Sequence, residues 1–290
     1  MTGAAVAVCG RVAAARTLLF VPGDRPDRFE KAAAAGAGAV VLDLEDAVMA
    51  DRKAASRTHV CDWLDSGWPA MVRVNPAASH WFAEDLDLVA GRDCVVMLPK
   101  AESASQVTAV SRCLGQAGGV VPLVETPVGV ARAPEICAAV GVVRPAFWHL
   151  DLAVALRVDP DNRDALLYAR SALVLAAAAA EVAAPFDGVT TAIGDRALLE
   201  ADIAHGLGLG MTGKLCIHPS QVPIAHAALA PMPRDVSWAR QVIEAAADSE
   251  VRAVDGRMVD PPVLSRARAI LARAMSDDDG SLPPGERRKG

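Results

Sequence analysis

The sequence lacks any run of more than three basic residues and any apolar run long enough to cross a membrane. Its 29 lysines and arginines are outnumbered by 35 acidic residues, which gives a net charge of −6, whereas a nucleic-acid-binding surface is a basic stripe. The longest uncharged apolar stretch, residues 171–180, is far shorter than the roughly 20 residues that a membrane span needs. We therefore expect neither nucleic acid nor a membrane as a partner.

Cysteine is scarce, and its distribution does not indicate a disulfide framework. The six cysteines are scattered and never spaced as Cys-x-x-Cys. Disulfide frameworks belong to short secreted chains, and residues 1–15 lack the charged start and the long apolar core of a signal peptide. These features favour free thiols in a reducing compartment, and we expect a cytoplasmic protein.

Aromatic residues are rare, at 4% of the chain, although 52% of the side chains are hydrophobic. This is ample material for one large core, and a chain of 290 residues fits a barrel domain of about 250 residues. Short β-branched or aliphatic runs alternate with helical patterns, which is typical of a parallel βα architecture. The eight runs are 17–21, 40–44, 70–74, 94–98, 120–124, 146–150, 186–189 and 211–217.

Eight such units predict an α/β fold, a (β/α)8 TIM barrel with a C-terminal helical extension. An open doubly wound sheet is the alternative, but no Gly-x-Gly-x-x-Gly follows the first run. We expect a flexible leader at 1–15, the barrel at 16–250, a segment at 251–275 that completes the active site, and a disordered tail at 276–290.

Charged residues occur at the C-terminal ends of the apolar runs, and this end is the catalytic face of a TIM barrel. Side chains two positions apart share one face of a strand, so Asp43 and Glu45 should lie together, and Arg73 should share a face with Met71. If these faces are turned to the barrel axis, the polar groups converge at one mouth.

Glu125 and Asp151 end the fifth and sixth runs and are the best candidates for a magnesium site. Mg²⁺ takes one or two carboxylates together with waters and substrate oxygens, and Arg73 offers a planar fork for a substrate carboxylate. A 2-oxo acid that chelates the ion could then carry negative charge on its keto oxygen while a carbon–carbon bond breaks or forms. The alternative is that the two acids only cap or pair with Lys100 or Arg73.

Asp43, Glu45 and Asp46 form an acidic cluster directly after the second run. Such residues could surround a metal-bound water and hold it in place. They could equally cap the helix that starts near Asp51, and both interpretations stay open.

Seven motifs follow one another in an order that is typical of one enzyme family. They are RTLLFVPGDRPDRFEKA (16–32), VVLDLEDAV (40–48), MVRVN (71–75), VMLPKAES (96–103), PLVETPVG (122–129), GKLCIHPSQ (213–221) and DGRMVDPPVL (255–264). Taken jointly, the motifs resemble the citrate lyase β-subunit/malyl-CoA lyase family, which is part of the HpcH/HpaI aldolase and citrate lyase superfamily of CoA-ester lyases.

The resemblance implies a role for each matching residue. It implies that Arg73 binds the substrate carboxylate and that Glu125 and Asp151 hold Mg²⁺, with Glu125 also near the substrate. Asp260 resembles the catalytic acid/base of the family, which is often delivered by a neighbouring protomer. A carboxylate that is shielded by a closing segment could protonate the enolate that the cleavage releases.

Further features of the resemblance concern coenzyme A and the assembly. Arg25, and with less support Lys31, resemble contacts to coenzyme A, which would enter as part of the substrate. The resemblance also implies a homotrimer or hexamer.

The sequence departs from the family pattern beside Asp151. Many members have Gly-x-Glu-Asp-Leu where this chain has Trp148, His149, Leu150, Asp151 and Leu152. Glycine lets the backbone approach a ligand closely, so tryptophan in its place puts the identity of the substrate in doubt. We interpret His149 as a buried, hydrogen-bonded side chain on the same strand face as Asp151.

The leading hypothesis is therefore a Mg²⁺-dependent carbon–carbon lyase. Its substrate would be a 3-hydroxyacyl-CoA thioester of the malyl-, citramalyl- or citryl-CoA type, cleaved to acetyl-CoA or a homologue and a 2-oxo acid. The alternatives are a metal-dependent aldolase on free 4-hydroxy-2-oxo acids, an enzyme that also hydrolyses the thioester, and a citrate lyase subunit that acts only within a carrier-protein complex. A barrel that serves only as a binding scaffold is a further alternative, prompted by Trp148.

Overall fold

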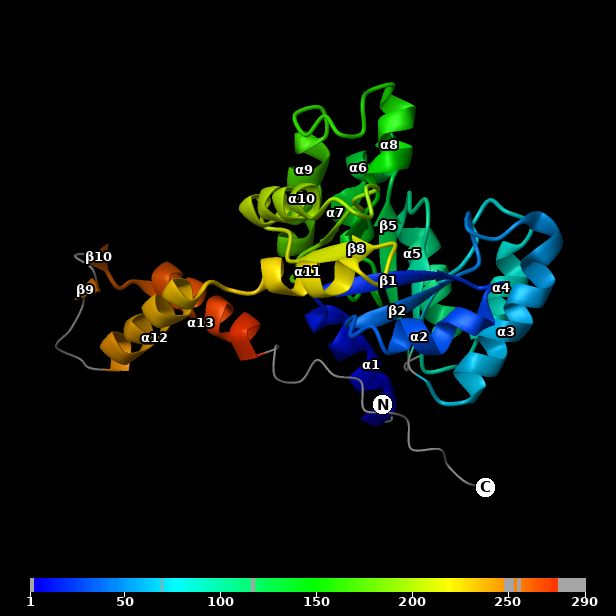
Figure 1. The fold of residues 1–290 in the computed structure, drawn as a ribbon, viewed down its shortest axis with the longest axis horizontal. Coiled ribbons are helices and arrows are strands. Elements are labelled where there is room, and N and C mark those ends of the chain that lie inside the picture. Colours follow the sequence, from blue (N-terminus) through cyan, green and yellow to red (C-terminus); the bar gives the residue numbers. More distant parts are fainter. Residues whose placement is uncertain (1–2, 69, 116–117, 248–252, 255–256, 276–290) are drawn as a thin grey trace. The chain divides into compact units, whose positions relative to one another are not determined.

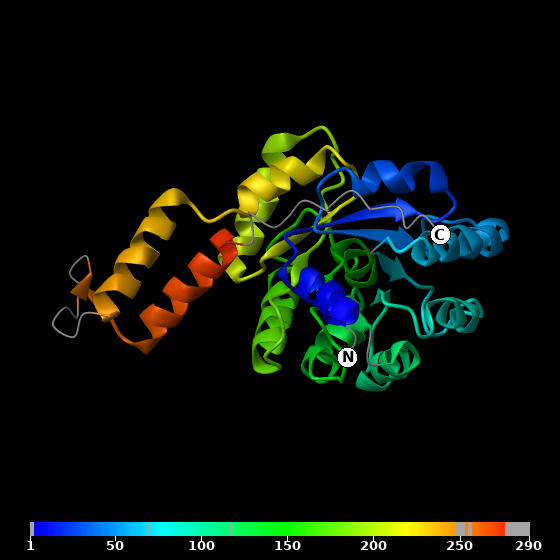
Figure 2. The same cartoon turned by 90° about the horizontal axis from the view of Figure 1, so that it is seen from below.

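The computed structural model describes residues 3–68, 70–115, 118–247, 253–254 and 257–275 (Figures 1 and 2). The described residues form two compact units, which divide between Ala228 and Leu229. In the described part of the chain, no helix has the length and apolar character that crossing a membrane requires.

The first unit is a closed barrel of parallel strands, in which each strand pairs with the next and β1 pairs with β8. This confirms the predicted (β/α)8 fold. In the residues described, the eight strands are β1 (Thr17–Pro22), β2 (Ala39–Asp43), β3 (Met71–Arg73), β4 (Val95–Leu98), β5 (Gly119–Val124), β6 (Ala146–Phe147), β7 (Phe186–Asp187) and β8 (Gly213–Cys216).

Helices follow the strands and surround the barrel, as Figure 2 shows. The best-capped of them, α5, begins after Ser103, whose side chain and that of Gln106 each accept a backbone hydrogen bond from the other residue. The helices are η1 (Pro26–Arg28), α2 (Phe29–Ala33), η2 (Ala50–Arg52), α3 (Lys53–Asp65), α4 (Phe82–Val89), α5 (Ala104–Leu114), α6 (Pro127–Ala131), α7 (Ala133–Cys137), α8 (His149–Leu156), α9 (Leu167–Ala179), α10 (Arg196–Leu209) and α11 (Gln221–Leu229).

The first described residues differ from the flexible leader that we expected at 1–15. Gly3–Ala14 forms helix α1, and Val12 of this helix is buried in the barrel core. The side chains of Val8 and Cys9 also pack against that core. An Ala/Val-rich segment can form a stable helix when a hydrophobic surface is available to cover it.

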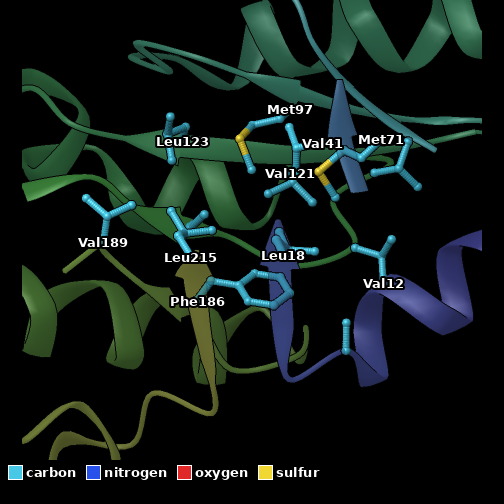
Figure 3. Close-up of a cluster of buried hydrophobic side chains, with 13 residues drawn as sticks. Val12, Leu18, Val41, Met71, Met97, Val121, Leu123, Phe186, Val189 and Leu215 are labelled. Atoms are coloured by element: carbon cyan, nitrogen blue, oxygen red, sulfur yellow. The ribbon is translucent and has the colours of Figure 1, made fainter. Parts of the chain in front are cut away.

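The barrel interior is filled mainly by aliphatic side chains, with the ring of Phe186 among them (Figure 3). Val41 and Met71 are fully buried in this interior, and they are followed on the same strand faces by Asp43 and Arg73. Leu123 likewise precedes Glu125 by two residues. The predicted alternation is thus confirmed, and it aims these polar side chains into the mouth of the barrel.

Strand β6 is shorter than the sequence suggests. It ends at Phe147, and helix α8 begins at His149, so Asp151 lies in the first turn of a helix and not at the end of a strand. The expected strand face shared by His149 and Asp151 is therefore wrong. A short apolar run is compatible with either a strand or a helix start, and periodicity alone does not separate them.

The second unit contains helices α12 (Pro233–Ala247) and α13 (Pro261–Met275) and the short strands β9 (Ala253–Val254) and β10 (Arg257–Met258). The two helices pack through Ala239, Val242 and Ala267, which are fully buried. The predicted helical extension is present, although it starts about twenty residues before the expected end of the barrel at 250. The tail at 276–290 lies outside the described residues.

Arg144 is buried where the strands begin. Its guanidinium donates to the carbonyl oxygen of Ala15 at 2.6 Å, to Thr212 Oγ1 at 2.8 Å and to the carbonyl oxygen of Ala184. The guanidinium carbon lies 3.7 Å from the ring centroid of Phe186. Arg144 therefore links the segment after α1 to the starts of β7 and β8.

We expect Arg144→Met to lower the free energy of unfolding by about 3 kcal/mol, because it leaves several buried acceptors without a donor. Urea unfolding followed by circular dichroism measures the change. Arg112→Met, which removes an exposed charge from α5, is the control and should leave the unfolding midpoint in place. An unchanged midpoint in the Arg144 variant would show that these contacts do not stabilise the barrel.

Candidate active site

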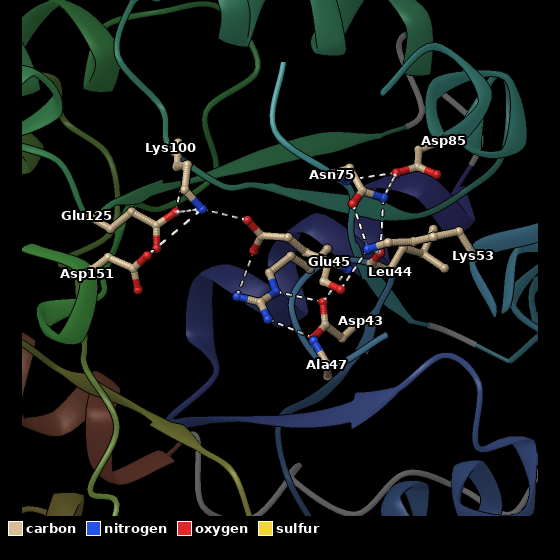
Figure 4. A network of polar contacts seen from close by, with 11 residues as sticks. Asp43, Leu44, Glu45, Ala47, Lys53, Asn75, Asp85, Lys100, Glu125 and Asp151 are labelled. Atoms are coloured by element: carbon tan, nitrogen blue, oxygen red, sulfur yellow. Dashed lines mark hydrogen bonds and ion pairs between the residues drawn. The ribbon is translucent and has the colours of Figure 1, made fainter. Parts of the chain in front are cut away.

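Polar side chains meet at the C-terminal ends of β2 to β6 (Figure 4). The centre of this group is the ion pair of Asp43 and Arg73, which stand opposite each other in the register of β2 and β3. Arg73 donates through Nε and Nη2 to the two carboxylate oxygens of Asp43, each at 2.7 Å. Both side chains are buried, so this bidentate pair is shielded from water.

Asp43 also fixes the loop that follows it. Its carboxylate accepts from the backbone N–H of Glu45 at 2.9 Å and of Ala47 at 3.2 Å. Four donors therefore face one carboxylate among the described residues. Of the two interpretations of Asp43, one placed it around a metal-bound water; in the structure its oxygens are engaged with Arg73 and the loop.

The guanidinium of Arg73 is enclosed on its remaining sides. Its Nη1 lies 3.0 Å from Glu45 Oε2, and its central carbon lies 5.0 Å from the ring centroid of Phe20 and 5.4 Å from that of Trp148. Burial alone would lower the pKa of Arg73, but Asp43 and Glu45 together raise it above its usual value. Arg73 is therefore a permanent cation, and Asp43 occupies the edge that we expected to bind a substrate carboxylate.

Lys100 connects this ion pair to the two candidate metal ligands. Its Nζ lies 2.8 Å from Glu45 Oε1 and 3.9 Å from both Glu125 Oε1 and Asp151 Oδ1. Both acids thus pair with Lys100 in the structure, at the outer limit of an ion pair. One ammonium lies at the same distance from both carboxylates, so Glu125 and Asp151 both face the Nζ of Lys100 (Figure 4).

The acids of the site are held in a setting that disfavours their charge. Burial raises the pKa of Glu125 to about 8, with Glu45 and Asp151 adding to the shift and Lys100 opposing it. Burial likewise raises the pKa of Glu45, against the effects of Arg73 and Lys100. The two glutamates are 2% and 3% exposed, so water screens their repulsion poorly.

The donor set fits a divalent cation of the magnesium type. Among the described residues of this cluster, four carboxylates face two cations (Arg73 and Lys100), which leaves a deficit of positive charge. No group of three His, Cys, Asp or Glu side chains in the described part could hold an ion alone. Magnesium does not need one, because it takes one or two carboxylates and fills its other positions with water and substrate oxygens.

Lys53 belongs to the site although nothing in the sequence pointed to it. It is buried in the first turn of α3, and its ammonium donates to the carbonyl oxygens of Leu44 at 2.6 Å and Glu45 at 2.8 Å and to Asn75 Oδ1 at 2.8 Å. Asn75 in turn donates to Asp85 Oδ2 at 2.6 Å. A lysine at the start of a helix is normally solvent-exposed, and only the tertiary structure shows that this one fixes the backbone of Glu45.

A cavity of about 360 Å³ adjoins the carboxylate cluster. Its lining combines charged side chains, neutral polar groups and one aromatic ring. The residues that line it include Glu45, Asp46, Lys53, Asn75, Ser79, Trp81 and Lys100. Asp46 is exposed here, which differs from the buried position of Asp43 and Glu45.

In the described part of the chain, Arg25 and Lys31 make no hydrogen bond or ion pair with this cluster, and Asp260 belongs to the other unit. Arg25 follows β1 and donates to both carboxylate oxygens of Asp27, at 3.0 and 2.9 Å, while Lys31 is exposed on α2. Asp260 lies in the second unit, where its Oδ1 accepts from the backbone N–H of Val263 at 3.0 Å and caps α13.

His149 differs from the hydrogen-bonded side chain that we expected. It is buried, and its Nδ1 has no hydrogen-bond partner among the described residues. Burial lowers the pKa of His149 to about 4, so the imidazole is neutral near pH 7. The charges that act on it include those of Arg170, Lys214 and Asp187.

The fold and the acidic cluster at the ends of its strands define a (β/α)8-barrel enzyme. The model of the HpcH/HpaI aldolase/citrate lyase family matches residues 16–219. The chain belongs to this family and is a lyase, as the seven motifs indicated.

Within the family, the chain is similar to several curated proteins and solved structures. The chain is similar to a citrate lyase subunit beta-like protein of Mycobacterium tuberculosis, with 39% identity over 264 residues that cover 88% of this chain and 94% of that protein. It is similar to a (3S)-malyl-CoA thioesterase of Cereibacter sphaeroides, with 33% identity over 274 residues that cover 89% and 94%.

The solved structure is that of CitE from M. tuberculosis in complex with magnesium, acetoacetate and coenzyme A. It resembles this chain with a TM-score of 0.77 and 38% sequence identity. The match covers 90% of this chain and 98% of that chain, so the likeness includes more than the barrel core.

We expect the metal-free protein to lose stability as the pH rises, because of Glu125. The folded protein keeps the Glu125 proton up to about pH 8, whereas the unfolded chain releases it near 4.5, so the stability from this group is complete below the lower pKa and disappears as the pH passes the upper one. Glu125→Gln should therefore melt several degrees above the wild type at about pH 8.5 and alongside it at about pH 5.

Differential scanning calorimetry in the presence of a chelator measures these melting temperatures. Glu135→Gln, at an exposed glutamate of α7, is the matched control and should follow the wild type at both pH values. If the melting temperatures of the wild type and Glu125→Gln depend on pH in the same way, the raised pKa of Glu125 is wrong.

Proposed function

We propose that this chain is a Mg²⁺-dependent lyase that cleaves a 3-hydroxyacyl-CoA thioester of the malyl-, citramalyl- or citryl-CoA type. The products would be acetyl-CoA, or a homologue, and a 2-oxo acid. The observation that carries the proposal is the pair of carboxylates, Glu125 and Asp151, that face one cation at the mouth of the barrel. The M. tuberculosis CitE structure with magnesium, acetoacetate and coenzyme A supports it.

Glu125 and Asp151 would hold the metal, since both are oxygen ligands next to a deficit of positive charge. Stabilisation of negative charge on the keto oxygen of the 2-oxo acid is the chemistry that Mg²⁺ supplies when bound. Asp43 would keep Arg73 oriented, and the carboxylate of the 2-oxo acid would meet Arg73 on its Nη1 side, where Glu45 now lies.

The cleavage also requires a proton at carbon. As the hydroxyl group of the substrate releases its proton to a base and becomes the keto group of the 2-oxo acid, the bond between the two carbons breaks and its electron pair forms the enolate of the acyl-CoA. Protonation of that enolate at carbon gives the thioester product, so the net change moves one proton from oxygen to carbon. We assign the protonation of the enolate to Asp260, supplied by the segment of residues 251–275 of a neighbouring protomer in a homotrimer or hexamer. Arg25 and Lys31, on the segment after β1, are assigned to the anionic groups of coenzyme A.

A panel of substrates, each with Mg²⁺, tests the reaction. We expect the purified chain to convert at least one CoA thioester to acetyl-CoA or its homologue and a 2-oxo acid, and Glu125→Ala to lower this rate at least a hundredfold by removing a metal ligand. Glu135→Ala is the control for loss of a carboxylate elsewhere.

The products also separate the competing functions. Turnover of free 4-hydroxy-2-oxo acids without any need for the CoA moiety would identify an aldolase. Free CoA among the products would indicate a thioesterase, for which the C. sphaeroides relative is the precedent. Activity that requires an acyl carrier protein would indicate a subunit of a complex.

We expect Asp260→Asn to lose most of its turnover, by a factor of about a hundred or more, while it keeps its Mg²⁺ affinity. Asparagine retains the oxygen that accepts from Val263, so the start of α13 should be preserved. Steady-state kinetics and calorimetric titration with Mg²⁺ measure the two effects. Wild-type turnover in this variant would remove Asp260 from the mechanism.

A further inference from the structure

Lys100 has a backbone conformation that is unusual for its residue type. Its φ is +48°, in the left-handed region, although it carries a β-carbon. Its backbone N–H donates to Glu125 Oε1 at 2.7 Å. Residues hold such a conformation only when their surroundings enforce it, and here the conformation places both the backbone and the side chain of Lys100 against the candidate metal ligands.

The ammonium of Lys100 lies beside both acids that would bind the metal. In the part of the chain that the structure describes, Lys100 provides the single ion-pair partner within 4 Å of Glu125 and of Asp151. It also donates to Glu45 at 2.8 Å, as Figure 4 shows. A dication held by Glu125 and Asp151 would have to share this space with a like charge, which a poorly screened site disfavours.

The side chain of Lys100 has a place to which it can move. It is 36% exposed, and it lines the cavity of about 360 Å³ that also contains Asp46, Asn75 and Ser79. Asp46 contributes to the electrostatic environment of Lys100, and asparagine and serine oxygens can accept from an ammonium. The four-carbon stem of lysine is flexible enough for such a turn.

We propose that Lys100 is the resident counter-ion of this carboxylate cluster, and that a divalent cation displaces its ammonium into the adjoining cavity. The inference rests on the proposed function, because it takes Glu125 and Asp151 as the metal ligands. Displacement carries a positive charge into the cavity only when the metal is bound. The cavity therefore attracts an anionic substrate more strongly once the metal is bound. Binding is then ordered, with the metal first and the substrate second.

Chemical labelling of the wild-type protein tests the movement directly. Acetic anhydride acetylates accessible, unpaired amines, and mass spectrometry reports the extent at each lysine. We expect Mg²⁺ to increase the labelling of Lys100 several-fold, whereas the buried Lys53 and Lys214 should not respond. The double variant Glu125→Ala and Asp151→Ala should lose the response to Mg²⁺. Labelling of Lys100 that stays constant or falls on addition of Mg²⁺ would overturn the proposal.

Calorimetric titration with Mg²⁺ at about pH 8.5, where protons compete less for the carboxylates, tests the competition. Lys100→Met keeps the length of the side chain and removes the charge, so it should bind Mg²⁺ about tenfold more tightly than the wild type. Lys100→Arg keeps the charge and should not gain affinity. Arg112→Met removes an exposed charge from the far end of α5 and should match the wild type.

The outcomes distinguish the two hypotheses. If the wild type binds Mg²⁺ but Lys100→Met binds it equally or more weakly, the proposed displacement of Lys100 (the exchange) is wrong, and the metal site of the proposed function is retained. If neither the wild type nor Lys100→Met binds Mg²⁺, the metal site of the proposed function fails, and the exchange fails with it. Should Lys100→Met not fold, the labelling of the wild-type protein decides alone.

Discussion

The bidentate pair of Asp43 and Arg73 is the interaction on which the site depends. Two opposite charges are stable in a barrel interior only if each is fully engaged, and Asp43 meets this requirement with two N–H groups of Arg73 and two backbone N–H groups of its own loop. The loop is thereby fixed, and Glu45 is aimed at both Arg73 and Lys100. Lys100 in turn reaches Glu125 and Asp151, so every ionic contact of the site continues from this pair.

The barrel separates the residues that stabilise it from those that act. Where the strands begin, α1 covers the core and Arg144 donates to neutral acceptors, an arrangement that contributes packing and order. Where the strands end, the same interior faces carry Asp43, Arg73 and Glu125 in place of aliphatic side chains. Repulsion between the carboxylates gathered there lowers the free energy of unfolding, and the same negative charge attracts a cation to the site.

The sequence was most informative where structure is decided locally. Alternation along the strands predicts that Asp43 shares a strand face with Val41 and that Arg73 shares one with Met71, because a strand presents every second side chain to one face. The structure shows that these faces are turned to the barrel interior. No local pattern predicts that the guanidinium of Arg73 is bound by Asp43, because the two residues are 30 positions apart. Nor does one predict that the ammonium of Lys53 is buried and donates to the backbone after β2. The helix that begins at His149 was missed because its apolar sequence also suits a strand.

Trp148 shows how a departure from the family pattern acts through a side chain and not through the backbone. Its φ of −124° and ψ of 101° are ordinary extended values, so the freedom of glycine is not needed at this position. Its ring packs edge-on against that of Phe20, with the ring centroids 5.5 Å apart, and it lies against the guanidinium of Arg73. Tryptophan therefore adds an apolar wall beside the group that would receive a carboxylate. Such a wall excludes water and large substituents, so it limits the size of the substrate acid that can lie beside Arg73. The carboxylates that face Lys100 are not affected by it.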